Sequence, residues 1–447
     1  MEKGTVKEVI KEFQESGLPE VLPREIEVPL SSHKIIAIVG PRRSGKTYLL
    51  FLLIKKLHSR NISPEQIVYI NFEDPRLLPC DAKGMEFILE AYGELYPESR
   101  GEKSYFFFDE IHNVKDWEIG VRRIHDTKKC RIFLTGSSSK LMSREIATQL
   151  RGRTTRYEVF PFSFREILSA KGIQLKKDIA YSMERFSIKN YLDEYLTMGG
   201  FPEIVLEESQ DLRMRILKEY LETMFFRDLV ERHRIRNQPL LRELMKFLAT
   251  NTANIFSANA YFKWTKNTYP LTKRTLLNYI GYLEDTGLFF LVRKFSFSLK
   301  EQTLRPRKCY IIDNGLRTAY GFKFSEDKGK NLENAVFIEL LHRKATNPLA
   351  EIFYWQDHKK REVDFVVRQG RDVRELIQVC DRIDDFRVKE REIRALTGAS
   401  EELRCDNLSV ITFDYEKEET ISGKKVVFKP LWKWLIEGDG DEGRKKP

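Results

Sequence analysis

Eight residues near the start of the chain have the types and spacing of a phosphate-binding loop, GxxxxGK[ST]. These residues are Gly40, Pro41, Arg42, Arg43, Ser44, Gly45, Lys46 and Thr47. In such a loop, backbone N–H groups and the start of a helix hold the phosphates, the lysine reaches the β and γ phosphates, and the threonine hydroxyl binds Mg²⁺. The apolar run Ile35–Val39 and the helix-like run Tyr48–Lys55 flank the loop, as this chemistry requires. We therefore expect ATP and Mg²⁺ as cofactors.

A pair of adjacent carboxylates follows the apolar run Tyr105–Phe108. Asp109, at the end of the strand that this run predicts, would hold the Mg²⁺ shell, and Glu110 would polarise the attacking water. The plainer alternative is an acidic strand end without a catalytic role. Because a phosphate-binding loop precedes it, the carboxylate pair favours ATP hydrolysis.

Two further positions could complete a hydrolytic site. The apolar run Ile132–Leu134 leads into Thr135 and, two residues later, Ser137, where a hydroxyl could orient the water or sense the γ phosphate. We favour Ser137 over Thr135 for this role. An arginine of the basic run 151–153 could enter the site of a neighbouring subunit as a finger, and a solvated surface arginine is the alternative.

The elements that must position these residues are strands and helices in alternation. From Lys34 to about residue 170, short apolar runs alternate with helix-like segments, which is typical of an α/β domain with a parallel sheet covered on both faces. The next part has a helical pattern that Gly199-Gly200 and Pro202 interrupt. We interpret the chain as an N-terminal lead (1–30), an α/β nucleotide-binding core (31–172), a helical lid (173–235), a winged helix (236–325), a further α/β unit (326–437) and a disordered tail (438–447).

The winged helix is predicted from two amphipathic runs and two short apolar runs. Leu240–Thr250 and Lys273–Leu283 have helical periodicity, while Leu288–Val292 and Phe295–Phe297 are expected to form a two-stranded wing. The residues of the second helix that are expected to face inward are Leu276, Leu277, Ile280 and Leu283.

Basic residues on this winged helix are candidates for binding nucleic acid. Lys273 and Arg274 begin the second helix, whose first turn would meet a groove, and Arg293 and Lys294 lie on the wing. The whole chain has 77 Lys and Arg against 67 Asp and Glu, a formal net charge of +10, which favours approach to a polyanion. DNA is therefore our expected partner; a winged helix that binds protein, with its charges merely solvated, is the alternative.

The last α/β unit resembles the PD-(D/E)xK restriction-endonuclease-like fold in the order of its polar residues. Sites of that fold hold a divalent metal on a helix Glu, a strand Asp and a second strand acid, with a Lys two residues later. Glu333 and Asp364 match, whereas Gln378 and Cys380 stand where the acid and the lysine should be. Glu375 is three residues from Gln378, on the opposite strand face, and cannot replace it. We interpret a degenerate nuclease fold that does not cleave DNA and is retained for DNA or subunit binding; a working variant is the alternative.

Other features of the composition limit the class of protein. No run is apolar for the length of a bilayer span, and residues 1–8 lack the apolar stretch of a signal peptide. The five cysteines are widely spaced and form neither a CxxC pair nor a metal-binding pattern. We expect a cytoplasmic protein without a membrane partner.

Several motifs together resemble the prokaryotic AAA+ ATPases that are common in archaea and carry a C-terminal domain of unassigned function. The residues that carry the resemblance are 40–47, 69–74, 109–112, 135–138, 151–153, 160–166 and 199–202. The resemblance implies an AAA+ core, Arg153 as the finger, and assembly into rings or other homo-oligomers.

These expectations converge on an oligomeric AAA+ ATPase that hydrolyses ATP with Mg²⁺ to move or remodel nucleic acid, in particular duplex or branched DNA. Two other classes of protein remain open. A nucleotide-controlled signalling or defence switch would turn over slowly and engage a protein, and a protein-remodelling ATPase would act on protein clients.

Overall fold

The computed structural model describes residues 1–99, 103–127, 130–137, 150–176, 178–321, 328–381, 383 and 385–438. The chain divides into two compact units, Met1–Phe160 with Asp285–Gly287, and Pro161–Glu284 with Leu288–Pro447. Each unit combines helices with strands, so the predicted α/β class is confirmed. Within the described ranges, no helix is both long and apolar enough to cross a membrane.

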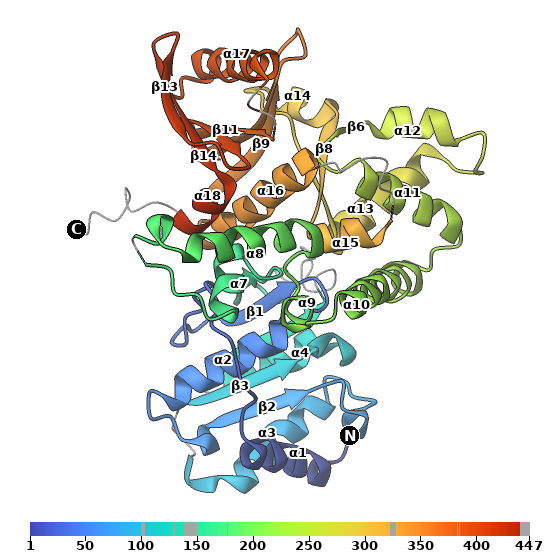
Figure 1. Ribbon diagram of the computed structural model, residues 1–447. Helices are drawn as coiled ribbons and strands as arrows, with labels where there is room; N and C mark the ends of the chain where they lie inside the picture. Colours follow the sequence, from blue (N-terminus) through green and yellow to red (C-terminus); the bar gives the residue numbers. More distant parts are fainter. Residues whose placement is uncertain are drawn as a thin grey trace. The chain divides into compact units, whose positions relative to one another are not determined.

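The first unit is built around a five-stranded sheet in which all neighbouring strands are parallel, in the order β2-β3-β4-β1-β5 (Figure 1). The strands are β1 (Ile35–Gly40), β2 (Ile67–Asn71), β3 (Ser104–Asp109), β4 (Cys130–Ser137) and β5 (Thr154–Glu158). The helices are α1 (Lys3–Ser16), α2 (Lys46–His58), α3 (Gly84–Leu95) and α4 (Trp117–Thr127). The apolar runs Ile35–Val39, Tyr105–Phe108 and Ile132–Leu134 lie within β1, β3 and β4, as predicted.

Helices cover both faces of this sheet, which explains why its strands are continuously apolar. On one face, α2 packs Leu49 and Leu53 against Ile36 of β1. On the other face, α1, α3 and α4 pack against a separate set of strand residues that includes Val39 and Phe108. Because the strands are parallel, the carboxyl ends of β1, β3 and β4 meet at one edge, where the loops carry the predicted nucleotide site.

The second unit begins with helices. They are α7 (Phe164–Ala170), α8 (Glu184–Met198), α9 (Pro202–Leu206), α10 (Gln210–Thr223), a π-helix (Met224–Glu231) and α11 (Gln238–Thr250). The interruption predicted between α8 and α9 is confirmed, with Gly199 at φ 77°. The Gly200 N–H donates to the Asp313 carboxylate (2.6 Å), and a Cβ on Gly199 would lie 2.0 Å from an oxygen of the same carboxylate. This turn therefore needs glycine, both for its backbone angle and for the close approach of Asp313.

A three-stranded antiparallel sheet and four helices follow. They are β6 (Ile255–Phe256), α12 (Ala258–Thr265), α13 (Lys273–Asp285), β7 (Phe289–Val292), α14 (Leu299–Leu304), β8 (Arg307–Ile311) and α15 (Asn314–Ala319), with the strand order β6-β8-β7. The predicted wing was wrong in its second strand, because β7 pairs with β8 and not with Phe295–Phe297. The backbone beside Lys294 instead bonds to Tyr354 of another sheet, which removes residues 295–297 from the hairpin.

The inward face of α13 differs at one position from the expectation. Leu276, Ile280 and Leu283 are buried as predicted, but Leu277 is 49% exposed and Tyr279 is buried in its place. The spacing 276, 279/280 and 283 follows one face of a helix, and residue 277 lies about 100° away from residue 276. Periodicity should therefore outweigh hydrophobicity at this position.

The chain continues into a mixed six-stranded sheet, in the order β13-β14-β12-β11-β10-β9 (Figure 1). Its elements are α16 (Lys328–Thr346), β9 (Ala350–Gln356), β10 (Glu362–Gln369), β11 (Asp372–Cys380), α17 (Phe386–Leu403), β12 (Leu408–Thr412), β13 (Lys417–Ile421), β14 (Lys424–Pro430) and α18 (Leu431–Glu437). Glu333 lies on helix α16, and Asp364, Gln378 and Cys380 lie on strands β10 and β11, in the order that the resemblance predicted. Strands β10 and β11 are antiparallel neighbours, so residues of both strands can meet on one face.

Candidate nucleotide site and carboxylate cluster

The phosphate-binding loop lies between the end of β1 and the start of α2. Gly45 adopts a left-handed conformation (φ 93°) at the position that caps α2. The Lys46 ammonium is buried and donates to the carbonyls of Gly40 (3.2 Å) and Pro41 (2.9 Å). Arg24 braces the loop by donating to the carbonyl of Ser44 (3.0 Å). Lys46 and the first turn of α2 are thus a fit for a phosphate group, whose oxygens would be charged acceptors in place of the neutral carbonyls.

Three hydroxyl groups converge on Asp109 at the carboxyl end of β3. Tyr69 donates to its Oδ2 (2.9 Å), Thr135 donates to its Oδ1, and Thr47 also hydrogen-bonds to it. The strand register explains the convergence, since β2 and β4 flank β3. Burial raises the pKa of Asp109, although these hydroxyl groups oppose the shift. The structure therefore brings together Thr47 and Asp109, the pair predicted to hold Mg²⁺, and a hard oxygen-ligand cation suits this donor set.

Glu110 lies directly after β3 in a left-handed conformation (φ 49°), which turns its side chain away from the strand direction. Its backbone N–H donates to Thr135 Oγ1 (3.0 Å), and its Oε2 lies 3.0 Å from His112 Nδ1. Burial alone would raise the pKa of Glu110, but the His112 hydrogen bond and the charges of Lys46 and Arg42 outweigh it and lower the pKa. Glu110 is thus held as a carboxylate, the form that can polarise water.

The two hydroxyl candidates on β4 have different surroundings. Thr135 is buried and contacts both Asp109 and the Glu110 backbone. Ser137 pairs with Gly40 through the strand ladder, but its side chain lies outside the described residues. Thr135 lies beside both carboxylates because β4 is the neighbour of β3. The sequence interpretation considered Thr135 only as an alternative to Ser137 and did not predict these contacts.

Arg153 lies at the opposite end of the sheet from the phosphate-binding loop. Its carbonyl accepts from the N–H of Ile35, at the start of β1, whereas the loop follows the end of β1. Its guanidinium donates to both carboxylate oxygens of Asp126 on α4, at 2.9 and 3.1 Å. This position excludes direct contact with the nucleotide site of the same chain.

The four basic residues predicted to meet DNA occupy two elements. Lys273 and Arg274 are exposed in the first turn of α13. Arg293 is exposed and Lys294 half-buried just after β7, where the Arg293 carbonyl accepts from the N–H of Tyr354 (3.1 Å). Residues 293 and 294 therefore run beside strand β9 and do not form the tip of a wing.

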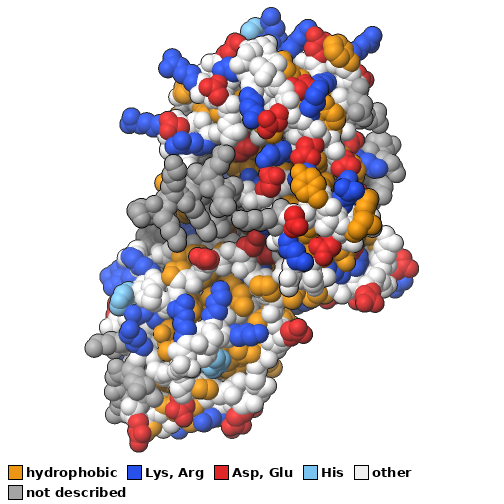
Figure 2. Space-filling model, turned by 60° about the vertical axis from the view of Figure 1, so that its left-hand side comes forward, with side chains coloured by type: hydrophobic (Ala, Val, Ile, Leu, Met, Phe, Trp, Pro, Cys, Tyr) orange, Lys and Arg blue, Asp and Glu red, His pale blue; other side chains and the backbone are white. Residues whose placement is uncertain are grey.

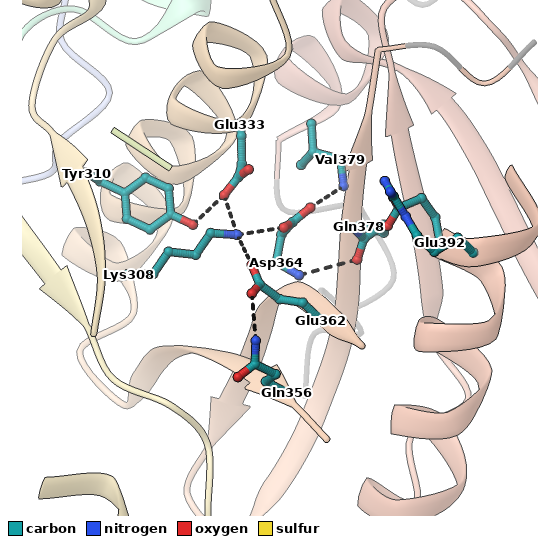
Figure 3. Close-up of polar contacts among 10 residues, drawn as sticks. Lys308, Tyr310, Glu333, Gln356, Glu362, Asp364, Gln378, Val379 and Glu392 are labelled. Carbon is teal, nitrogen blue, oxygen red and sulfur yellow. Dashed lines mark hydrogen bonds and ion pairs between the residues drawn. The ribbon is translucent and has the colours of Figure 1, made fainter. Parts of the chain in front are cut away.

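The nuclease-like residues meet a lysine that the sequence interpretation did not include (Figure 3). Lys308 of β8 points its ammonium at Glu333 of α16 (2.8 Å) and at Glu362 (2.7 Å) and Asp364 (2.7 Å) of β10. Lys308 is 1% exposed; burial lowers its pKa, but the three carboxylates and Tyr310 raise it well above the usual value. Burial and the charge of Asp364 raise the pKa of Glu333, so negative charge is crowded in this cluster.

Gln378 and Cys380, which stand where the acid and the lysine of a nuclease should be, lie in different surroundings. The Gln378 side chain accepts from the N–H of Asp364 (3.3 Å) and donates to Glu392 of α17 (2.7 Å). Cys380 is buried in an apolar cluster with Leu376 and residues of α17. Lys308 and Glu362 bring to the cluster a positive charge and a further carboxylate that the sequence interpretation did not include.

A weak signal for these residues is present in the sequence. Lys308 precedes the apolar run Cys309–Ile312, and a lysine at a buried strand position calls for a charged partner. Glu362 is two residues before Asp364, on the same strand face. No group of three or more His, Cys, Asp or Glu side chains within the described ranges is arranged to hold a metal ion.

Comparisons with known proteins agree with the nucleotide site. A family model described as an AAA domain matches residues 32–168, and two described as domains of unknown function, DUF8612 and DUF4143, match residues 189–327 and 328–432. The chain is 39% identical to uncharacterized protein MJ1544 of Methanocaldococcus jannaschii, over 93% of this chain and 91% of that protein. It is 28% identical to an uncharacterized protein of Haemophilus influenzae, over 90% of this chain and 94% of that protein.

Solved structures give only distant likenesses. The Aeropyrum pernix ORC2 protein aligns over 75% of this chain and 92% of its own with 12% identity and a TM-score of 0.37. The Aeropyrum pernix ORC1 protein in complex with DNA aligns over 71% and 90%, with 12% identity and a TM-score of 0.29. The assignment rests on the AAA domain match, the phosphate-binding loop and the full-length relatives. The chain therefore carries an AAA domain at residues 32–168 and belongs to the same family as MJ1544 of Methanocaldococcus jannaschii.

Proposed function

We propose that this protein is an oligomeric ATPase that hydrolyses ATP with Mg²⁺ and uses the reaction to move or remodel duplex or branched DNA. One observation carries the ATPase part. Lys46 and Thr47 begin helix α2, whereas Asp109 ends strand β3 and Glu110 follows it, yet the four residues meet at the same edge of the parallel sheet. This is the set of groups that P-loop phosphoryl transfer requires.

Each residue has a separate task in this proposal. Lys46 binds the β and γ phosphates, while Thr47 and Asp109 hold Mg²⁺, which when bound would neutralise phosphate charge. Glu110 orients the attacking water and accepts its hydrogen bond at a carboxylate oxygen. Ser137 remains our proposed sensor of the γ phosphate. Thr135 keeps Asp109 and Glu110 in position through its two contacts.

The order of elements in residues 238–311 supports a winged helix. Helix α11, the short strand β6 and helices α12 and α13 lead into the antiparallel pair β7 and β8, and β6 adds to the other side of β8. Helix α13 is the second helix of the pair that would dock on DNA, and its apolar side is buried.

The start of α13 supports a phosphate contact. Helix N-termini carry partial positive charge, so basic residues there are unfavourable unless an anion binds. Lys273 and Arg274 nevertheless occupy the first turn, which holds no acidic residue. On the face in Figure 2, acidic and basic side chains are interspersed, so the net charge alone does not locate a binding surface.

The double variant Lys273→Glu/Arg274→Glu is expected to lower DNA affinity and leave basal ATPase activity intact. The slope of log affinity against log salt should flatten by about two units, one for each lost phosphate contact. Fluorescence anisotropy with duplex and four-way DNA at several salt concentrations measures this slope, and ATPase assays with and without DNA measure stimulation.

A matched control is Lys359→Glu/Arg371→Glu, which makes the same charge change at two exposed residues flanking β10. It should keep the wild-type salt slope. If both double variants lower affinity equally, the effect comes from net charge and α13 is not the contact. If the wild type neither binds DNA nor is stimulated by it, a protein client or a signalling role replaces DNA remodelling.

Arg153→Ala is expected to reduce ATP hydrolysis by about 1,000-fold, the lower end of what arginine fingers contribute, without loss of nucleotide affinity. The reason is that Arg153 would complete the site of a neighbouring subunit, since it lies far from its own. Mixing with Lys46→Ala subunits, which keep an intact Arg153, should restore part of the activity in a steady-state ATPase assay.

Asp126→Asn is the control for the surface ion pair, because it removes the partner of Arg153 and keeps the arginine. It should retain most of the activity. Equal losses in Arg153→Ala and Asp126→Asn, or no rescue in mixed oligomers of verified composition, would assign Arg153 to a structural role.

A further inference from the structure

The nuclease-like carboxylates already surround a cation, the ammonium of Lys308. Oxygens of Glu333, Glu362 and Asp364 lie 2.8, 2.7 and 2.7 Å from its Nζ. An ammonium has three N–H donors, and three carboxylates accept here, so no donor remains for a further ligand. The convergence point of the carboxylates is filled by the end of a lysine side chain.

Neutral donors fix each of the three carboxylates from outside (Figure 3). The Tyr310 hydroxyl donates to Glu333 (2.7 Å), the Gln356 amide to Glu362 (3.3 Å), and the N–H of Val379 to Asp364 (2.8 Å). Such outer contacts orient ligands in metal sites. The carboxylates are therefore preorganised around a cation and do not depend on Lys308 alone for their orientation.

The residues do not fit the divalent metal that the resemblance to a nuclease fold implies. Mg²⁺ requires oxygen ligands at about 2.0–2.1 Å in near-octahedral geometry, with room for water. Here Lys308 occupies the space between the carboxylates and is 1% exposed. A metal ion could enter only if the lysine left, which would leave an ammonium without its charged partners in a buried position.

We propose that Lys308 is a built-in cation that takes the place of a divalent metal, so that Glu333, Glu362 and Asp364 form a metal site closed by a lysine of β8. The lysine also ties two sheets together, because β8 belongs to the three-stranded sheet and β10 to the six-stranded sheet. The site accepts Mn²⁺ or Mg²⁺ once the lysine side chain is removed.

A catalytic lysine is the rival role for the same residue. In a working nuclease the lysine has a donor free for the scissile phosphate or the attacking water. Lys308 uses its three donors on the three carboxylates, which favours the role of a replacement for the metal.

The test compares Mn²⁺ binding by nucleotide-free wild type, Lys308→Ala and Lys308→Met, with equilibrium dialysis and Mn²⁺ electron paramagnetic resonance. Lys308→Ala should bind about one more Mn²⁺ per chain than the wild type, at least about tenfold more tightly than any site of the wild type. Lys308→Met fills the space without charge and should bind no more Mn²⁺ than the wild type. The nucleotide site is the same in all three proteins, so it cancels in the comparison.

Thermal unfolding provides a second readout. Mn²⁺ should raise the Tm of Lys308→Ala but not of Lys308→Ala/Asp364→Asn, which lacks one ligand. If Lys308→Ala folds and binds no additional Mn²⁺, the proposal is overturned.

If Lys308→Ala fails to fold, a comparison of the wild type with Asp364→Asn also decides the question. Wild-type protein should not cleave DNA in Mg²⁺ or Mn²⁺, and Asp364→Asn should bind as much Mn²⁺ as the wild type. Metal binding or DNA cleavage that Asp364→Asn abolishes would refute the proposal and make Lys308 part of a working nuclease.

Discussion

Glu110→Gln is expected to stop ATP turnover while ATP stays bound. The glutamine keeps the size of the side chain but loses the carboxylate that polarises the water, and such groups contribute about 10²–10⁴-fold to rate. Phosphate binding should persist, because Lys46 and the start of α2 are unchanged. A steady-state phosphate-release assay and a titration with fluorescent ATP measure the two effects separately.

The surroundings of Glu110 make this variant informative. The pKa of Glu110 is lowered, in spite of its burial, by the His112 hydrogen bond and the charges of Lys46 and Arg42. It is therefore ionised at neutral pH, and the variant replaces a charged group. Asp116→Asn, at an exposed position six residues later, is the control and should keep normal turnover. Near wild-type turnover in Glu110→Gln would show that another group activates the water.

Lys46→Ala is expected to weaken ATP binding about tenfold to 150-fold, which corresponds to the ~1.5–3 kcal/mol of a hydrogen bond to a charged group. Turnover should fall as well, because the lysine contacts the phosphates in both the ground state and the transition state. Isothermal titration calorimetry with ATP at fixed Mg²⁺ measures the affinity.

Lys55→Ala provides the matched control, since Lys55 is an exposed lysine on the same helix. It should bind ATP as the wild type does. The Tm of Lys46→Ala must also be measured, because Lys46 is buried and holds the carbonyls of Gly40 and Pro41. Unchanged affinity in a folded Lys46→Ala protein would place the nucleotide elsewhere.

The two variants together separate binding from chemistry. Loss of turnover in both, with loss of affinity only in Lys46→Ala, is the pattern that the site predicts. This pattern would support ATP hydrolysis at the site of Lys46 and Glu110. The conclusion would not depend on whether the protein binds DNA or on how the Lys308 variants bind metal.

Local sequence determined the parts of the fold that depend on neighbouring residues. The phosphate-binding loop was predictable because its glycines, Lys46 and Thr47 have a fixed spacing between a strand and a helix. The apolar runs located β1, β3 and β4, since a buried parallel strand needs apolar residues on both faces. The buried stripe of α13 follows helical periodicity, and Leu277 was misplaced because hydrophobicity was given more weight than spacing.

Strand pairing was not determined in this way. Residues 295–297 looked like a strand next to β7, but β8, which follows α14, takes that place. Residues 295–297 and strand β8 are both short, and neither sequence predicts which of the two pairs with β7. The choice depends on long-range packing, including the contact of residue 294 with Tyr354.

The sequence by itself determined that this chain has a phosphate-binding loop, adjacent carboxylates after a strand, and an α/β fold. Only the tertiary structure decided that Tyr69 and Thr135 bond to Asp109, that Arg153 pairs with Asp126 far from its own site, and that Lys308 fills the nuclease-like carboxylate cluster. The physical reason is range. Loops and helices are set by residues a few positions apart, whereas these contacts join residues 25 to 56 positions apart, which sheet order and packing bring together.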